Sequence, residues 1–97
     1  MKAYARIFKA IGDENRLRII VALAKQPYGV CDLARHLGLS QPTLSHHLKI
    51  LRDTELVKGE REGQSTSCSL NFETFERFGV DVKKLLAHRR EDVIHGV

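Results

Sequence analysis

A run of polar side chains between Ser40 and Arg52 has the residue types needed to contact nucleic acid. The set is Ser40, Gln41, Thr43, Ser45, His46, His47, Lys49 and Arg52. Glutamine bonds bidentately to adenine, serine and threonine reach bases or phosphates, and lysine, arginine and histidine serve phosphates or guanine. In the same run, Leu44, Leu48 and Leu51 are spaced by four and three residues, which places them on one helical face. The pattern predicts a helix that buries its leucines and presents a polar face suited to a DNA major groove.

A shorter amphipathic helix is predicted just before this one. Leu33, Ala34 and Leu37 share one face of it, and Gly38 stands where a helix commonly ends in a residue with positive φ. Ser40 then offers an N-cap hydroxyl to the second helix, and a proline lies in the first turn of that helix, where a missing N–H costs little. Two capped helices joined by a tight turn indicate a helix-turn-helix.

The residues before this motif predict two further helices. Ala3–Ile11 carries a wide apolar face, and Gly12 ends it. Asp13 fits the N-cap of a second helix, whose apolar residues recur at three and four residues until a C-terminus near Gln26. Pro27–Gly29 is expected to be a connection into the helix-turn-helix.

The residues after the motif predict a hairpin and a final helix. Glu55–Gly59 and Ser65–Leu70 are expected to form strands joined by the charged turn Glu60–Gln64. Apolar spacing then predicts one helix from Phe72 to about Arg90, with Gly79 as a kink or weak point. The expected fold class is mainly α with a small two-stranded β-wing, which is a winged helix-turn-helix.

The composition is that of a small, basic protein. The 97 residues contain 16 Lys and Arg against 12 Asp and Glu, a formal net charge of +4, which suits a polyanionic partner. We find no signal-peptide pattern and no apolar run approaching ~20 residues, and the two cysteines lie far apart. These features predict a cytoplasmic protein with no membrane segment.

Three stretches resemble the corresponding parts of the ArsR/SmtB family of bacterial repressors: GDENRLRIIVAL, VCDLARHLGLSQPTLSHHLKILRDTELV and EREGQS. The resemblance implies a dimeric, operator-binding transcriptional repressor that is released by an inducer, often a metal or metalloid ion. The major-groove residues that it implies are Gln41, Thr43, Ser45, His46 and His47. It also implies that a wing around Arg61–Ser65, with Arg61 and Gln64, reaches the adjacent minor groove or backbone, and that the first and last helices form the dimer interface.

The terminal helices independently favour a dimer. Phe8, Phe72, Phe75 and Phe78 offer more apolar surface than a core of this size readily covers, although all four could instead pack inside one monomer. We therefore expect residues 1–97 to form a single DNA-binding domain with dimerisation helices at both ends. A two-fold dimer requires a pseudo-palindromic operator.

The cysteines leave the inducer open. Arsenic-responsive relatives carry a Cys-Val-Cys pair where this chain reads Gly29-Val30-Cys31, so the usual two-cysteine metalloid motif is incomplete. Cys31 can pair with Cys68 or with its symmetry mate to form a dithiol for an ion or a disulfide for redox sensing. The alternative is that the cysteines are merely small apolar residues, as free cysteines commonly are.

A second candidate ion site lies at the C-terminus. Its imidazole and carboxylate groups are spaced by three and four residues, which suits zinc, nickel or cobalt on a continuing helix. The residues are His88, Glu91, Asp92 and His95. The alternative is a charged tail without a metal.

Together these patterns predict a sequence-specific DNA-binding protein, and the resemblance implies a repressor whose operator affinity is modulated by an inducer. A metal or metalloid ion and a thiol oxidant are the candidate inducers, and the identity of the inducer stays open. An enzyme is not expected, because one helix in so small a domain supplies little pocket around Cys31. The remaining alternative is a winged helix that binds protein or RNA without binding an operator. Steep salt dependence and preference for one palindrome would distinguish operator binding from that alternative.

Overall fold

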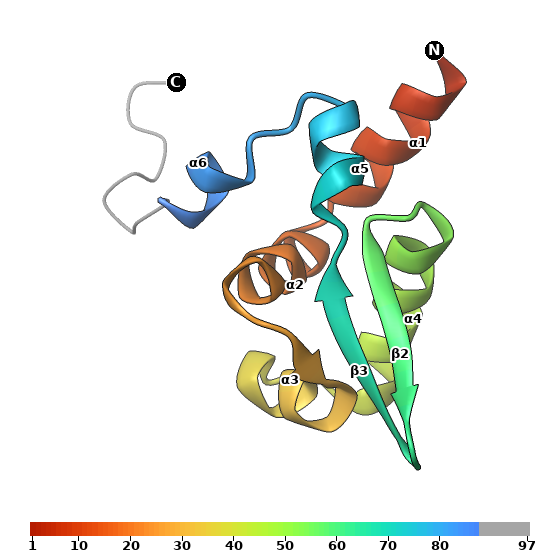
Figure 1. The fold of residues 1–97 in the computed structure, drawn as a ribbon, viewed down its shortest axis with the longest axis vertical. Helices are drawn as coiled ribbons and strands as arrows, with labels where there is room; N and C mark the ends of the chain where they lie inside the picture. The colour runs from red at the N-terminus through yellow and green to blue at the C-terminus, as the bar shows by residue number, and fades with distance from the viewer. Residues whose placement is uncertain (88–97) are drawn as a thin grey trace.

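The computed structural model describes residues 1–87, and these form a mainly helical fold with a small sheet (Figure 1). The elements in chain order are α1 (Lys2–Ile11), α2 (Glu14–Lys25), β1 (Tyr28–Gly29), α3 (Val30–Leu37), α4 (Gln41–Asp53), β2 (Val57–Glu62), β3 (Ser65–Leu70), α5 (Phe72–Arg77) and α6 (Val82–Leu86). The predicted winged helix-turn-helix is confirmed, with α3 and α4 as the helix pair and β2–β3 as the wing. No helix among the described residues has the length and apolar character needed to cross a membrane.

The helix boundaries follow the predicted capping signals. The Asp13 carboxylate accepts a hydrogen bond from the Arg16 backbone N–H at 3.1 Å, which caps α2. Gly38 ends α3 with a φ of 67°, a left-handed conformation that costs glycine little. The Ser40 hydroxyl then accepts a hydrogen bond from the Thr43 N–H at 3.3 Å and caps α4. The helix-turn-helix is therefore specified by residues close to one another in sequence.

The sheet has one strand more than predicted. Its order is β1-β3-β2, and both pairings are antiparallel. The expected connection Pro27–Gly29 contains β1, in which Tyr28 pairs with Cys68. The strand β2 also runs on to Glu62, because a two-residue turn that begins with Gly63 at φ 64° replaces the longer expected loop. The second strand of the predicted wing was thus placed correctly, whereas the first begins at Val57 and ends at Glu62 instead of running from Glu55 to Gly59.

The single long C-terminal helix was the main wrong prediction of the fold. Helix α5 ends at Arg77, and Gly79 adopts a φ of 73°, which no continuing helix allows. The chain restarts at α6, where the Asp81 side chain accepts hydrogen bonds from two backbone N–H groups. Residues 88–97, and with them the predicted helix end near Arg90, lie outside the described part of the chain.

The core lies where α2, α3 and α4 meet the sheet. Its fully buried apolar side chains include Ile19, Ile20, Leu33, Leu44, Leu48, Leu51 and Leu56. Two of the four phenylalanines that were expected to offer apolar surface to a second subunit are covered within the monomer. Phe75 is only 1% exposed and belongs to this core, and Phe78 is half-buried. Phe8 and Phe72 remain 53% and 48% exposed. The uncovered aromatic surface of the monomer is therefore carried by α1 and the start of α5.

Candidate nucleic-acid interface

One side of α4 carries most of the predicted DNA-contact residues. Leu44, Leu48 and Leu51 are buried, as their spacing predicts. The exposed residues of the predicted set are Ser40, Gln41, Thr43, Ser45, His46, Lys49 and Arg52. Because the apolar face anchors α4 to the core, these side chains are presented on a fixed helix, and no other described part of the chain covers them.

His47 is the exception, and its expected place on the outer face was wrong. Its side chain is 10% exposed, because position 47 follows Leu44 by three residues and so falls on the buried face. Its Nδ1 lies 3.1 Å from Arg16 Nη1 and 3.9 Å from an Asp13 carboxylate oxygen. His47 therefore ties α4 to the start of α2.

Arg16 is a structurally important residue that sequence reasoning missed. Besides its contact with His47, its Nε donates to the Ala10 carbonyl at 2.6 Å. Its backbone N–H donates to Asp13, and this hydrogen bond lowers the pKa of the Asp13 carboxyl. One arginine thus links α1, α2 and α4. The only local signal was its position three residues after an N-cap aspartate, which does not reveal a partner 31 residues away.

Several exposed polar groups on α4 already have partners. The Ser40 hydroxyl donates to Thr43 Oγ1 at 2.9 Å in addition to capping the helix. Lys49 Nζ lies 3.0 Å from an Asp53 carboxylate oxygen, one turn later. These are exposed local interactions of modest strength, so a phosphate or a base can replace them. They hold the polar face in an ordered arrangement.

The wing lies beside α4, and one arginine spans the two. A Cβ placed on Gly59 of β2 would lie 3.4 Å from Arg52 Cδ, so the missing side chain leaves room for Arg52 to lie across the strand. Arg61 is exposed on β2, and Gln64 is exposed in the turn. The structure therefore brings the predicted wing residues and the end of α4 to one edge of the molecule. Gly59 was not anticipated.

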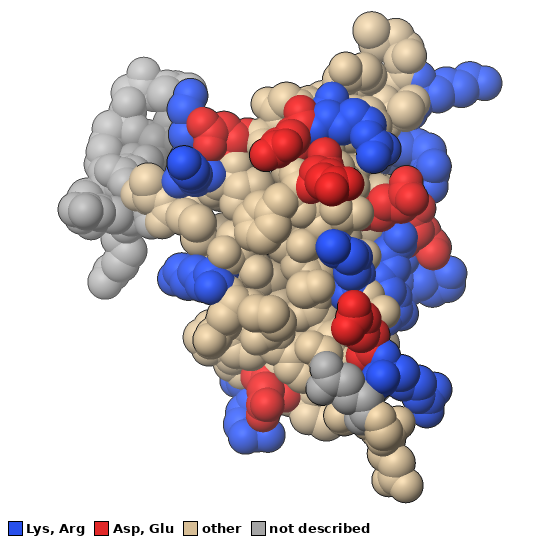
Figure 2. Space-filling view, in the orientation of Figure 1, with Lys and Arg blue, Asp and Glu red and all other residues tan. Residues whose placement is uncertain are grey.

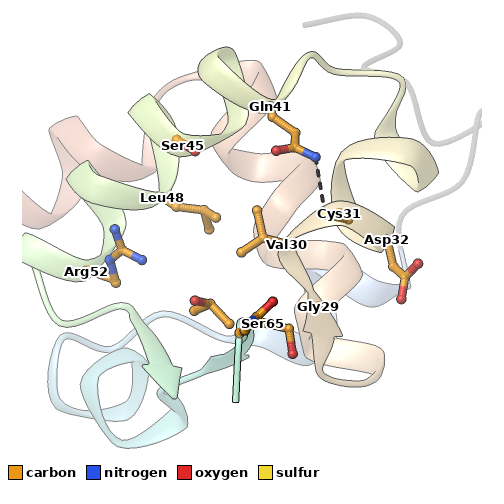
Figure 3. Close-up of a pocket in the computed structure, with 11 residues that line it drawn as sticks. Gly29, Val30, Cys31, Asp32, Gln41, Ser45, Leu48, Arg52 and Ser65 are labelled. Carbon is orange, nitrogen blue, oxygen red and sulfur yellow. Dashed lines mark hydrogen bonds between the residues drawn. The ribbon is translucent and has the colours of Figure 1, made fainter. Parts of the chain in front are cut away.

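A cavity of about 480 Å³ lies between α3, α4 and the wing (Figure 3). Gln41 and Arg52 reach toward it from opposite ends of α4, whereas Asp32 points away from it. Gln41 Nε2 donates to Cys31 Sγ at 3.2 Å, which connects the first turns of α3 and α4. Gln64, Ser65 and Thr66 line the wing side. The cavity opens beside the polar face and is suited to a polar or anionic group.

The two cysteines occupy different environments. Cys31 is exposed at this cavity, whereas Cys68, on the middle strand β3 between β1 and β2, is 0% exposed and packs in the core. Burial raises the pKa of the Cys68 thiol, which disfavours the thiolate needed for metal binding or oxidation. The structure therefore does not bring Cys31 and Cys68 together in one pocket. No group of three or more His, Cys, Asp or Glu side chains with metal-binding geometry occurs within residues 1–87. The other predicted ligands, His88, Glu91, Asp92 and His95, lie outside the described residues.

Charge is unevenly distributed over the visible face. Lys and Arg, with a few Asp and Glu between them, gather along the right edge of Figure 2, where Figure 1 draws α1 and α4. The middle of the same face, over α2 and β3, consists mostly of other residue types. The edge that carries α4 is therefore rich in Lys and Arg, as is the opposite edge around α6.

Comparisons with known proteins agree with this geometry. A family model described as "Bacterial regulatory protein, arsR family" matches residues 13–58, from the α2 N-cap into β2. The "Transcriptional repressor SmtB homolog" of Synechocystis sp. is 46% identical over 66 residues, which are 68% of this chain and 50% of that protein. The "Arsenical resistance operon repressor" of Staphylococcus xylosus is 42% identical over 72 residues, 74% of this chain and 69% of that protein. These relatives are transcriptional regulators and not enzymes, as the sequence predicted.

A solved structure extends the likeness to almost the whole chain. The homodimeric winged helix-turn-helix DNA-binding domain of Mb0332 from Mycobacterium bovis, described as a possible ArsR-family regulator, superimposes with a TM-score of 0.76 and 26% identity. The alignment covers 99% of this chain and 89% of that one. The capped helix pair, the wing and the relatives all lead to one assignment: the chain belongs to the arsR family of bacterial regulatory proteins.

Proposed function

We propose that this protein is a homodimeric, operator-binding transcriptional repressor and that residues 1–97 act as one DNA-binding domain. Helix α4 enters the major groove, and the β2–β3 turn contacts the adjoining minor groove or backbone. The observation that carries this proposal is the exposed polar face of α4, which continues through Arg52 onto the wing. An α-helix fits the major groove, and side chains of these types form hydrogen bonds with base edges and phosphates.

Within this proposal the side chains on α4 have different roles. The side chains of Ser45 and His46 have no hydrogen-bond partner among residues 1–87 and lie in the middle of the exposed face, so we assign base reading to them. Gln41 can exchange its bond to Cys31 for a base edge. Lys49, Arg52 and Arg61 supply positive charge for phosphates, while His47 is a positioning residue that holds α4 on α2.

The dimer is proposed to form through α1 and α5. Tyr4 stacks on Phe8 with ring centroids 6.4 Å apart and meets the half-buried Phe78 edge-on at 5.0 Å, so these three rings form one partly exposed cluster. Exposed aromatic clusters of this kind favour burial against a partner. The Mycobacterium bovis relative is itself homodimeric. A two-fold dimer places two α4 helices on successive turns of one face of DNA and demands a pseudo-palindromic operator.

We further propose that an inducer lowers operator affinity. For an inducer that reacts with thiols, such as a metalloid ion or an oxidant, Cys31 is the candidate because it is exposed and its sulfur contacts Gln41 of α4. A coupling of about 1 to 3 kcal/mol between inducer and operator is enough for regulation.

The test combines an operator selected from random duplexes with the double variant Ser45→Ala/His46→Ala. Each lost base contact costs about 1 to 3 kcal/mol, so we expect operator affinity to fall at least about 30-fold. Dimer formation, measured by sedimentation, should not change. The control is Gln26→Ala, an exposed polar residue at the end of α2, which should bind like the parent.

Two results would contradict the proposal. Unchanged operator affinity in the double variant would remove base reading from α4. Failure to select any palindrome, together with weak salt dependence of DNA binding, would instead favour a protein- or RNA-binding module, since operator binding must weaken steeply with salt.

A further inference from the structure

A second groove, of about 570 Å³, lies between α2, α3 and α6, apart from the polar face of α4. Leu17 and Val21 of α2, Leu37 of α3 and Leu85 of α6 give it an apolar lining. Its volume falls in the range of about 300 to 1,000 Å³ that is typical of small-molecule sites. The groove therefore has the size for a small ligand.

Basic side chains surround this apolar lining. Arg18, Lys25 and Lys84 line the groove with a single carboxylate, Glu14. The ammonium groups of Lys25 and Lys84 form no ion pair with any residue from 1 to 87. Three cations against one carboxylate around an apolar floor complement a molecule with an apolar body and a negatively charged head.

We propose that the groove binds a medium-chain carboxylate. The acyl chain lies on the leucine and valine side chains, and the carboxylate is held at Arg18, with Lys25 and Lys84 adding positive charge. Arginine is suited to this role because its planar guanidinium donates two parallel hydrogen bonds to a carboxylate. A ligand with a charged head but no acyl chain would make no contact with the leucine and valine side chains of the groove.

The same arginine connects the groove to the helix-turn-helix. Arg18 Nη2 donates to the Leu37 carbonyl at 2.6 Å, and its Nη1 donates to Asn15 at 3.1 Å. Leu37 is the last residue of α3, directly before the Gly38 turn that leads into α4. A carboxylate that engages Arg18 competes with the Leu37 carbonyl and loosens the attachment of this turn to α2. The regulatory step rests on the proposed operator binding, whereas ligand binding does not.

The binding test uses the full chain without DNA and follows its backbone amide resonances during titration with decanoate below the micelle concentration. We expect saturable shifts at Leu17, Val21 and Leu37. Acetate has the charge without the chain, and decyltrimethylammonium has the chain with the opposite charge, so neither should saturate these residues. Equal binding of either control would overturn the proposal.

Substitutions locate the site. Arg18→Gln should weaken decanoate binding about five- to tenfold, because a charge-assisted hydrogen bond is lost. Lys84→Gln, which leaves the Arg18 contacts intact, should weaken it about twofold and serves if Arg18→Gln does not fold. Arg35→Gln removes an exposed arginine of α3 that pairs with Asp32 and should bind normally. The proposal would be overturned if Arg18→Gln and Lys84→Gln bound decanoate with the same affinity as the control Arg35→Gln.

Two further measurements separate the remaining outcomes. The full-chain variant Glu91→Gln/Asp92→Asn should bind decanoate like the parent; a marked rise in affinity would show that the carboxylates of Glu91 and Asp92 compete for the groove and would overturn the proposal. Saturating decanoate should weaken operator binding about fivefold or more. If decanoate binds but does not weaken operator binding, only the regulatory step is overturned. If the protein does not bind the operator even in the absence of decanoate, the proposed function is contradicted instead.

Discussion

The region from α2 to β3 and the region of α5 and α6 are built in different ways. The first contains two helices whose N-caps accept backbone hydrogen bonds, a three-stranded sheet and most of the fully buried side chains. The second consists of helices of six and five residues on either side of Gly79, and its apolar core contribution is Phe75 and Val82. Such short helices depend on packing for their stability.

This difference matters for how a regulator works. A surface that reads bases must hold its side chains in fixed positions, and the continuous core under α4 provides this. A region that responds to a partner subunit or a ligand must open at lower free energy than the rest of the protein, and a region with few buried contacts does so. We therefore expect the first region to unfold as one unit and the second to open locally before it.

The largest expected effect comes from removing core side chains in each region. Leu44→Ala, in α4, should lower the free energy of unfolding by about 2 to 5 kcal/mol because Leu44 is fully buried. Leu85→Ala, in half-buried α6, should cost less than about 1 kcal/mol. Denaturant unfolding at one fixed protein concentration measures both, since dimers gain stability with concentration. Equal losses would show that the two regions are equally well packed.

An intermediate effect is expected from a matched pair of glycines. Gly38 and Gly79 both have positive φ, and an added Cβ would contact nothing within 4 Å at either site. Alanine at either position therefore introduces only backbone strain, of about 1 to 2 kcal/mol, and no steric clash. Gly38→Ala should lower the midpoint of global unfolding. Gly79→Ala should mainly speed amide exchange of residues 80–86. Equal shifts of the global midpoint would contradict separate opening of the second region.

The smallest effect concerns pH and the α2 N-cap. The hydrogen bond from the Arg16 N–H, reinforced by the charges of Arg16 and His47, holds the pKa of Asp13 below the ordinary aspartate value of about 4. A lowered carboxyl pKa contributes stability that is present above the unfolded pKa and is lost as pH falls through the folded pKa. An asparagine side chain at the same N-cap position caps equally well but does not titrate. The Tm advantage of the parent over Asp13→Asn should therefore be larger at pH 6 than at pH 3, and a constant difference would refute this account.

The elements that were predicted correctly depend on neighbouring residues. Gly38, Ser40 and Asp13 act within one helical turn, so their types and spacing were enough to place α2, α3 and α4. β1 was missed because two residues form a strand only when β3, some 40 residues later, pairs with them. The last helix was predicted too long because its apolar spacing continues across Gly79, while the positive φ there appears only in the folded chain.

In the candidate site, too, local sequence patterns did not reveal contacts between residues that are far apart in the chain. The exposed residues of α4 follow from the leucine spacing, but His47 fits both the polar composition of the outer face and the spacing of the buried one. Its place is settled by Arg16, whose distance along the chain hides it from local patterns. The second groove needs α2, α3 and α6 to meet, and nothing in any one of their sequences indicates it.

The small gap at Gly59 has a consequence for how operators are selected. Because Arg52 of α4 lies across β2 at this point, the helix and the hairpin are braced against each other within one protomer. This contact opposes movement of the helix and the hairpin against each other. In the proposed dimer, adjustment to DNA would then come mainly from turning one protomer against the other. Under the proposed function, operator choice would then depend on the number of base pairs between the half-sites as well as on the sequence of each half-site.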